Sequence, residues 1–546
     1  MCIKLPARTL TTTTTILVLL AAVAFTAALA KRAPVPLPLV LIAVGAGLSL
    51  VPGLERVEIE PHVFFLLLIP PLLFADGWLM PKRELVEVLR PVLLLAFGLV
   101  LMTVLGIGWL IHLLMPSIPL AAAFALGAIV SPTDATATNA MVARVGLPPR
   151  VTHILSGESL INDASGLVAF RFALAALATG TFSWWQAAGT LAVVAIGGTA
   201  IGIAIAAIVH GARIKLRRFG GDDPHAQTVL SVLTPFAAYL AAESVHASGI
   251  LAVVAAGLFA GWTDFRNADA ATRQHAWEVW AMLLFAFNGL AFLLLGLTLS
   301  HALATLEASD WPRYLGYALA LWAALTVLRL LWVFPSAYLP QIFARRASAG
   351  GRLADPREVF LVGWAGLRGS VTMAAALSIP ATLAAGDPFP ARHLIIFLAG
   401  TTIVLTLVLN GLTLPLIARA LGVKADHGAE RDRRIAEIAI AHAGTAALQR
   451  ELATLSRSEE LGQARELIAR YTRRAERLAA NAARANAFAH TQEIERKLTL
   501  LALDAERKEL YALRDAGTIN DQTLREIETR LDGIEMAALG ATRAAH

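Results

Sequence analysis

The sequence predicts an all-α membrane protein followed by a cytoplasmic helical tail. Hydrophobic residues make up 57% of the 546 residues and charged residues only 16%, whereas soluble domains average about 45–50% and about 25%. The apolar residues form runs close to the roughly 20 residues that a helix needs to cross a bilayer. Beyond residue 423 these runs end, and the chain becomes rich in Ala, Arg, Glu and Leu.

Thirteen apolar segments are candidates for transmembrane helices. The loops between them alternate between basic and nearly uncharged, and the positive-inside rule assigns the basic set to the cytoplasm. We therefore expect a multi-pass protein of the cell (plasma) membrane, with its N-terminus outside and its C-terminus in the cytoplasm. A transmembrane domain would cover residues 1–423 and the cytoplasmic helical tail residues 424–546. The approximate segments are 11–30, 35–52, 61–80, 91–115, 118–142, 151–178, 186–210, 226–246, 249–263, 275–301, 312–340, 357–384 and 392–421.

The first segment admits a second interpretation, because Ala28-Leu29-Ala30 is similar to a signal-peptidase site. Cleavage there would leave residue 31 outside and turn every basic loop outward, which the positive-inside rule opposes. We therefore expect the first segment to be retained as a helix.

Several classes of function have no support in the sequence. The single Cys2 excludes an intramolecular disulfide and a site with several cysteine ligands. The chain has no P-loop, so an ATP-driven pump has no support in the sequence. No motif indicates a cofactor, and no nucleophile–base pair indicates a hydrolytic enzyme. The net charge of +6 fits cytoplasmic loops and anionic lipid headgroups, and it does not imply nucleic acid.

The sixth segment contains polar residues where apolar ones are expected, in Ser156-Gly157-Glu158-Ser159-Leu160-Ile161-Asn162-Asp163. A charge at bilayer depth costs several kcal/mol, so such a residue is a functional candidate by default. On a helix, Ser159 lies four residues from Asp163, and Glu158 four residues from Asn162, so two adjacent faces carry polar groups. Asp163 can hold either a cation or a proton.

Two other segments contain helix-breaking residues at corresponding positions. Ser131-Pro132-Thr133-Asp134 interrupts the fifth segment, and Gly366-Leu367-Arg368-Gly369 interrupts the twelfth. Proline removes a backbone donor, and an unwound segment exposes carbonyl oxygens that can bind a cation. Paired interruptions of this kind indicate a transporter with inverted repeats and a site near the bilayer midplane.

The charged residues inside the apolar segments do not balance. Two arginines, Arg329 and Arg368, stand against four acids, which are Asp76, Asp134, Glu158 and Asp163. If all six share one region, a bound cation or proton supplies the missing positive charge. The four acids argue against a channel or symporter for anions. A membrane-embedded cation sensor that signals through the tail stays an alternative, which flux measurement would separate from a transporter.

These motifs, together with Pro70-Pro71, resemble those of the electroneutral sodium/proton exchangers of the monovalent cation:proton antiporter superfamily, cation:proton antiporter-1 type. The resemblance covers residues 11–421 and leaves the tail aside. It implies thirteen helices in two inverted repeats, a homodimer, and two broken helices that cross beside the ion site.

The resemblance also implies a role for each site residue. Asp163 would bind Na+ or a proton in turn, with Ser159 and the Thr133 carbonyl as further Na+ ligands. Asn162, also counted among the cation-binding residues, would keep the exchange electroneutral, and Glu158 would pair with Arg329. Asp134 and Arg368 would balance the helix dipoles at the crossing. Asp76 lies one position beyond the acid that the family often carries in its third segment, which bears on its role as an auxiliary ligand.

The expected function is therefore 1:1 exchange of Na+ for H+ by competition for Asp163 and alternating access. The preference among Na+, Li+ and K+ depends on ligand distances that a sequence does not contain.

Overall fold

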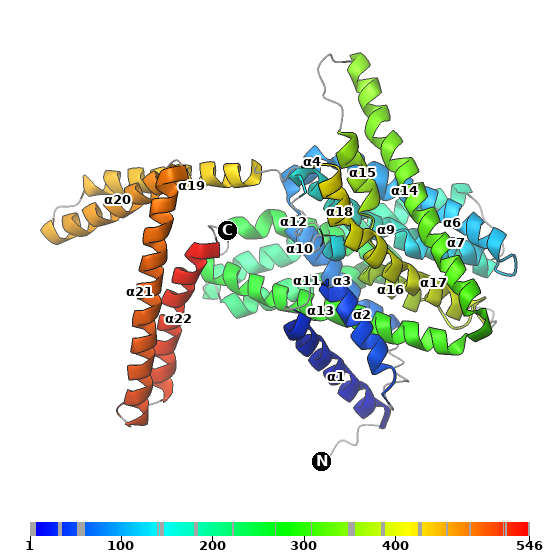
Figure 1. The fold of residues 1–546 in the computed structure, drawn as a ribbon, viewed down its shortest axis with the longest axis horizontal. Coiled ribbons are helices and arrows are strands. Elements are labelled where there is room, and N and C mark those ends of the chain that lie inside the picture. The colour runs from blue at the N-terminus through cyan, green and yellow to red at the C-terminus, as the bar shows by residue number, and fades with distance from the viewer. Residues whose placement is uncertain are drawn as a thin grey trace. The chain divides into compact units, whose positions relative to one another are not determined.

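The computed structural model describes residues 7–30, 35–51, 61–138, 141, 147–179, 184–220, 223–267, 269–306, 308–347, 355–383, 388–423, 428–454, 457–479, 482–516, 518 and 521–543. Every regular element in these ranges is helical, apart from an isolated β-bridge between Thr382 and Pro388. The all-α prediction is confirmed (Figure 1). The chain divides into two compact units, Met1–Asp426 and His427–His546.

The first unit contains the apolar segments, and each of them corresponds to one helix or to consecutive helical pieces. Among the described residues, six stretches are long and apolar enough to cross a membrane, and five shorter apolar helices accompany them. The number of crossings stays a prediction. The elements are α1 (Ala7–Ala30), α2 (Leu37–Leu48), α3 (Pro61–Leu79), α4 (Lys82–Glu87), α5 (Leu89–Leu93), η1 (Leu94–Leu99), α6 (Val100–Leu114), α7 (Leu120–Val130), α9 (Pro149–Thr179), α10 (Trp184–Gly220), α11 (Pro224–Ser244), α12 (Gly249–Asn267), α13 (Ala270–Thr305), η2 (Ala308–Asp310), α14 (Trp311–Ala347), α15 (Pro356–Trp364), α16 (Ser370–Leu377), α17 (Arg392–Leu405), η3 (Thr406–Gly411) and α18 (Leu412–Ala420).

The helices of this unit pack as two bundles. In one, which we call the companion bundle, α13 packs against α1, α2 and α11, and α12 packs against α3, α10 and α11. In the other, the crossing bundle, α7 packs against α6 and α9, α14 against α15 and α17, and α16 against α17. The bundles meet where α13 contacts α16 and α17, where α3 contacts α16, and where α9 contacts α3 and α12.

Glycines let helices of the companion bundle approach to backbone contact. A Cβ at Gly45 of α2 would lie 2.0 Å from the carbonyl oxygen of Leu293, and one at Gly296 of α13 would lie 2.0 Å from that of Ile42. Because no side chain fits at either position, α2 and α13 pack more closely than larger residues would allow. Small residues at helix contacts are the usual means of tight packing in membranes.

Two helices, one in each bundle, start with the same local signal. Asp223 precedes Pro224 at the start of α11, and Asp355 precedes Pro356 at the start of α15. Each aspartate accepts a hydrogen bond from the backbone N–H two residues on, which satisfies a donor that the helix leaves free. Proline at the first helical position loses no intrahelical hydrogen bond.

Lys82 caps the C-terminal end of α3. Its Nζ donates hydrogen bonds to the carbonyl oxygens of Trp78 (2.6 Å) and Gly77 (3.1 Å). A positive charge there also interacts favourably with the helix dipole. Burial nevertheless lowers the pKa of Lys82 from its usual 10.5 to about 8.

The folded protein is therefore expected to gain stability from Lys82 as the pH rises from 8 to 10.5. In that window the unfolded chain still binds a proton at Lys82 while the folded chain has released it, so raising the pH favours the folded state. The thermal midpoint in detergent should rise more with pH in the wild type than in Lys82→Met. An equal rise in both proteins would contradict this prediction.

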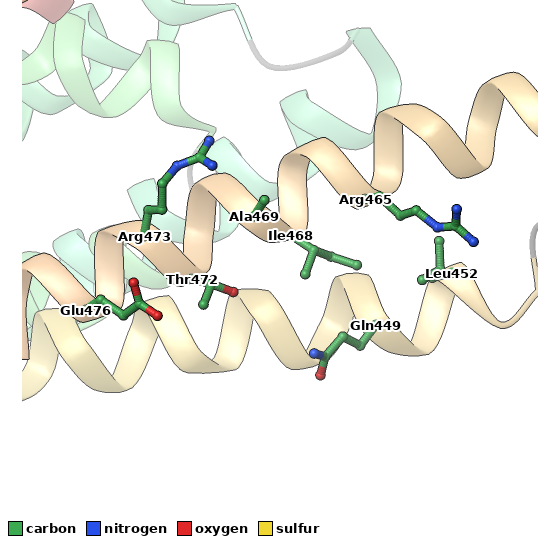
Figure 2. Close-up of a pocket in the computed structure, with 8 residues that line it drawn as sticks. All are labelled: Gln449, Leu452, Arg465, Ile468, Ala469, Thr472, Arg473 and Glu476. Carbon is green, nitrogen blue, oxygen red and sulfur yellow. The ribbon is translucent and has the colours of Figure 1, made fainter.

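The second unit is entirely helical in its described residues. Its helices are α19 (Gly428–Leu452), α20 (Ser458–Ala479), α21 (Ala482–Asp515) and α22 (Asp521–Arg543). The first two form an antiparallel hairpin with a shallow groove of about 400 Å³, which Leu452, Ile468, Arg465 and Arg473 help to line (Figure 2). The last two pack against each other through Leu503, Leu510, Leu524 and Leu531.

The tail sequence carries two sets of apolar residues at helical spacing, and the set on α21 does not form the buried contact of that helix. Ile494, Leu498 and Leu501 recur at helical spacing, but their exposed fractions are 45%, 60% and 68%. The buried contact uses the neighbouring face of α21, where Leu503 and Leu510 lie seven residues apart. Both faces carry leucines at helical spacing, so periodicity alone does not distinguish the packed face from the exposed one. The other set that the sequence offers is Leu452, Leu455, Leu467 and Ile468; Leu452 and Ile468 line the groove, and Leu455 lies outside the described residues.

Candidate functional site

The break after α7 lies directly against α9. Residues 131–134 are not helical, and the helix resumes at residue 135. The Ser159 hydroxyl of α9 donates to the Thr133 carbonyl oxygen, and Asn162 Nδ2 donates to Thr133 Oγ1 at 2.8 Å. The structure thus brings three of the predicted cation-binding residues, Thr133, Ser159 and Asn162, together in a buried position.

Asp163 lies on the same helix and is only 2% exposed. Its Oδ1 and the Oδ1 of Asn162 are buried oxygens with no hydrogen-bond donor among the described residues. Buried polar atoms nearly always have a partner, so each such oxygen needs an explanation. Carboxylate, amide and carbonyl oxygens are what a hard cation prefers as ligands, and a carboxylate can alternatively take a proton.

Two further carboxylates act electrostatically on Asp163. Asp134 at the break and Asp76 of α3 both repel its negative charge. Asp76 belongs to the companion bundle, whereas Asp134 and Asp163 belong to the crossing bundle. The cluster of acids therefore lies where the two bundles meet, and adding a positive charge there relieves repulsion.

Where the two broken helices cross, the negative charge of Asp134 lies at the N-termini of two helical pieces. Its carboxylate accepts hydrogen bonds from the backbone N–H of Ala137 (2.8 Å), where the first broken helix resumes, and of Ser370 (2.8 Å), where α16 begins. The Ser370 hydroxyl adds a third bond at 3.2 Å. A carboxylate at two helix N-termini is favourable, because both present free N–H groups and positive dipole ends.

At the same crossing, the positive charge of Arg368 lies against backbone carbonyl groups of both breaks. Its Nε donates to the carbonyl oxygen of Val130, the last residue of α7, and its Nη1 donates to that of Gly366, two residues after α15 ends. These are the carbonyl groups that helix C-termini leave without partners. The two breaks also touch directly, since the Asp134 N–H donates to the Leu367 carbonyl oxygen at 2.8 Å.

Glu158 and Arg329 form a buried ion pair in the crossing bundle. Arg329 Nη2 lies 2.7 Å from Glu158 Oε2, and Nη1 contacts Oε1. Arg329 also donates to the Val362 carbonyl oxygen of α15, from Nη2 at 3.0 Å and from Nε at 3.2 Å. The exposed side-chain fractions are 2% for Arg329 and 0% for Glu158, so the two charges neutralise each other in a buried position.

Two polar residues that the sequence does not mark as site residues connect elements of the crossing bundle by hydrogen bonds. Ser165 donates from Oγ to the Ala96 carbonyl oxygen (2.5 Å) within the π-helical segment η1, which ties α9 to that segment. Asn410, in the π-helical segment η3, donates to the Trp364 carbonyl oxygen (3.0 Å) at the end of α15. A polar residue inside an apolar segment was the only available signal for each of them.

Gly369 has to be glycine for the crossing to form. A Cβ there would lie 1.8 Å from Asp134 Oδ2, which is closer than any real contact. We expect Gly369→Ala to displace the Asp134 carboxylate from the α16 N-terminus and to lower the thermal midpoint and exchange together. Gly316→Ala is the matched control, since a Cβ there meets nothing within 4 Å. Wild-type stability in Gly369→Ala would contradict this account.

Comparison with known proteins identifies the family. The sequence model of the transmembrane sodium/hydrogen exchanger domain matches residues 18–420. The chain is a member of the sodium/hydrogen exchanger family. Of its relatives in this family, an uncharacterised Na+/H+ exchanger of Escherichia coli, YjcE, is 39% identical over 88% of this chain and 90% of its own length. A sodium, potassium, lithium and rubidium/H+ antiporter of Bacillus pumilus is 37% identical over 90% of this chain and 72% of its own length.

A solved structure of the same kind shares the fold. The sodium proton antiporter MjNhaP1 of Methanocaldococcus jannaschii aligns with 75% of this chain and 98% of its own, with a TM-score of 0.56 and 20% identity. This exchanger is thus a multi-pass membrane protein of the antiporter fold, and no enzymatic family is indicated.

Proposed function

We propose that the protein exchanges Na+ for H+ across the membrane, 1:1 and without net charge movement, by competition of the two ions for Asp163. The observation that carries this proposal is the buried Asp163 carboxylate beside the break after α7, whose Oδ1 has no hydrogen-bond donor in the part of the chain that the structure describes. A carboxylate in this position gains from either ion and is unfavourable when empty and charged, which couples the two fluxes.

The remaining charges of the crossing bundle support a single exchangeable positive charge. Glu158 is neutralised by Arg329, and Asp134 is stabilised by two helix N-termini. Asn162 is uncharged, so no second carboxylate stands beside Asp163 on its helix. One Na+ inward and one proton outward then carry equal charge.

The proposed Na+ ligands are oxygens of α9 and of the break that faces it, where the Ser159 hydroxyl contacts the Thr133 carbonyl oxygen. They are the Asp163 carboxylate, the Ser159 hydroxyl and the Thr133 carbonyl, and the first of these is also the proton acceptor. Asn162 contributes either its donor-free Oδ1 or the orientation of Thr133 through Nδ2. Asp76 acts from the companion bundle as an auxiliary acid.

Alternating access follows from the position of the site where the bundles meet. If the crossing bundle moves against the companion bundle, Asp163 can face one side of the membrane and then the other, while the Asp134 and Arg368 contacts stay within one rigid body. We further propose a homodimer in the plasma membrane, with the N-terminus outside and the C-terminus in the cytoplasm. The name of the B. pumilus relative supports testing K+, Li+ and Rb+ as well as Na+.

The test is reconstitution in liposomes with a pH-sensitive dye and a series of alkali cations, with choline as control. Addition of Na+ should dissipate a preset pH gradient at the same rate whether or not the membrane potential is clamped to zero, and no steady current should appear. Absence of any cation-dependent proton flux would favour the alternative function, a membrane-embedded cation sensor. A steady current would remove the electroneutral stoichiometry.

A further inference from the structure

An exposed ion pair joins α9, the helix that contains Asp163, to the companion bundle. Arg171 of α9, two helical turns beyond Asp163, places Nη2 2.8 Å from Glu243 Oε1, near the C-terminal end of α11. From the sequence alone Arg171 has no assigned partner, and Glu243 is an acid at a span end. The structure pairs them across the seam between the crossing bundle and the companion bundle.

Glu243 is fixed on its own bundle independently of Arg171. The same Oε1 accepts a hydrogen bond from the backbone N–H of Gly249 (3.2 Å), the first residue of α12. The turn between α11 and α12 places His246 at φ 60°, a left-handed conformation uncommon for a non-glycine residue. Tyr239, one turn earlier on α11, also interacts with Arg171. Glu243 is therefore a fixed anchor, and Arg171 is the group that a movement of the crossing bundle would carry away.

Elsewhere the bundles also meet through apolar surfaces that can slide. Gly400 of α17, for example, faces Leu295 and Leu299 of α13, and a Cβ there would reach ordinary or slightly tight contact at 3.3 to 4.0 Å. Small sliding movements between packed helices are a common form of domain motion. The Arg171–Glu243 pair, by contrast, is lost when its two groups move apart, so it favours the position of the bundles in which they meet.

We propose that Arg171 and Glu243 form a latch that closes one end of the ion site and opens once in each transport cycle. This inference rests on the proposed exchange by alternating access. In the expected topology the latch lies at the extracellular end, because α9 and α11 both run from a cytoplasmic loop toward it. Arg171 and Glu243 are positioning residues: they touch no ion and instead set the balance between the two facing states.

A reversible cross-link tests the latch directly. In a Cys2→Ser background, Arg171→Cys and Glu243→Cys are combined and joined with a short bifunctional methanethiosulfonate in proteoliposomes. Exchange should continue before cross-linking, fall at least tenfold afterwards, and return on reduction. The matched control joins His225→Cys of α11 to His275→Cys of α13, whose native rings lie 4.6 Å apart within the companion bundle. That cross-link should leave exchange unchanged.

Neutral variants provide a test that does not need the cysteines. Exposed ion pairs shift an equilibrium by about two- to fivefold, so Arg171→Gln and Glu243→Gln should each change the ratio of apparent Na+ affinities on the two sides by that factor. The double variant should change it no further, and the charge swap Arg171→Glu with Glu243→Arg should restore it.

The outcomes separate the latch from the function on which it rests. A wild type without exchange would refute the proposed function. A wild type that exchanges, together with a cross-linked latch that exchanges as fast as its control or an unchanged affinity ratio in both neutral variants, would overturn the latch alone.

Discussion

Asp163→Asn is expected to abolish Na+-dependent proton flux in proteoliposomes while the protein stays folded. The amide cannot take up a proton and offers no negative charge to a cation, so both half-reactions stop. Because Asp163 is buried and its Oδ1 finds no donor among the residues with described positions, replacing the charged group with a neutral one should leave the thermal midpoint equal or higher.

Asp76→Asn is the matched control for this variant. It also removes a carboxylate that repels Asp163, but it leaves the shared acceptor in place, so exchange should be reduced or shifted in pH and not lost. Exchange at the wild-type rate in Asp163→Asn, measured with the same amount of folded protein, would refute the role of Asp163 in coupling.

Arg329→Met is expected to be among the most destabilising substitutions in the chain. It leaves the Glu158 carboxylate uncompensated in a buried site, and breaking a buried ion pair from one side costs about 3–5 kcal/mol. The fraction of monodisperse protein in detergent and its thermal midpoint measure the loss. Adding Glu158→Leu should recover much of it, because removing both charges removes the desolvation cost. If the double variant is no more stable than Arg329→Met, the pair is not what stabilises this region.

The sequence points to residues that the structure brings together, because charge inside an apolar segment is costly and therefore rare. The spacing of Ser159 and Asp163 on one helix, and the breaks at Pro132 and at the glycines around Arg368, were visible without any structure. The resemblance supplied the pairing of helices far apart in the chain. Periodicity alone could not do so, since it tells which residues share a face of one helix and not which helix that face meets.

The partners that sequence reasoning missed are mostly backbone groups or residues at helix ends. Arg368 donates to two carbonyl oxygens, and no pattern of side chains marks them. Glu243 lies near the end of the predicted segment 226–246 and no sequence pattern marks a partner for it, yet the turn into α12 and Arg171 both hold it. In the tail, two leucine-bearing faces of α21 compete, and only packing against α22 decides between them.

The crossing has a consequence for how the protein is made. Asp134 and the N–H of Ser370 that it binds are 236 residues apart in the chain. At about 5–20 residues per second, a ribosome takes about 10–50 s to synthesise that interval. During this time the first broken helix remains in the membrane with free backbone groups, and the Asp134 carboxylate lacks the hydrogen bond from Ser370. A chain truncated between α14 and α15 should therefore be retained by membrane chaperones or degraded, although it contains every residue proposed to bind the ion.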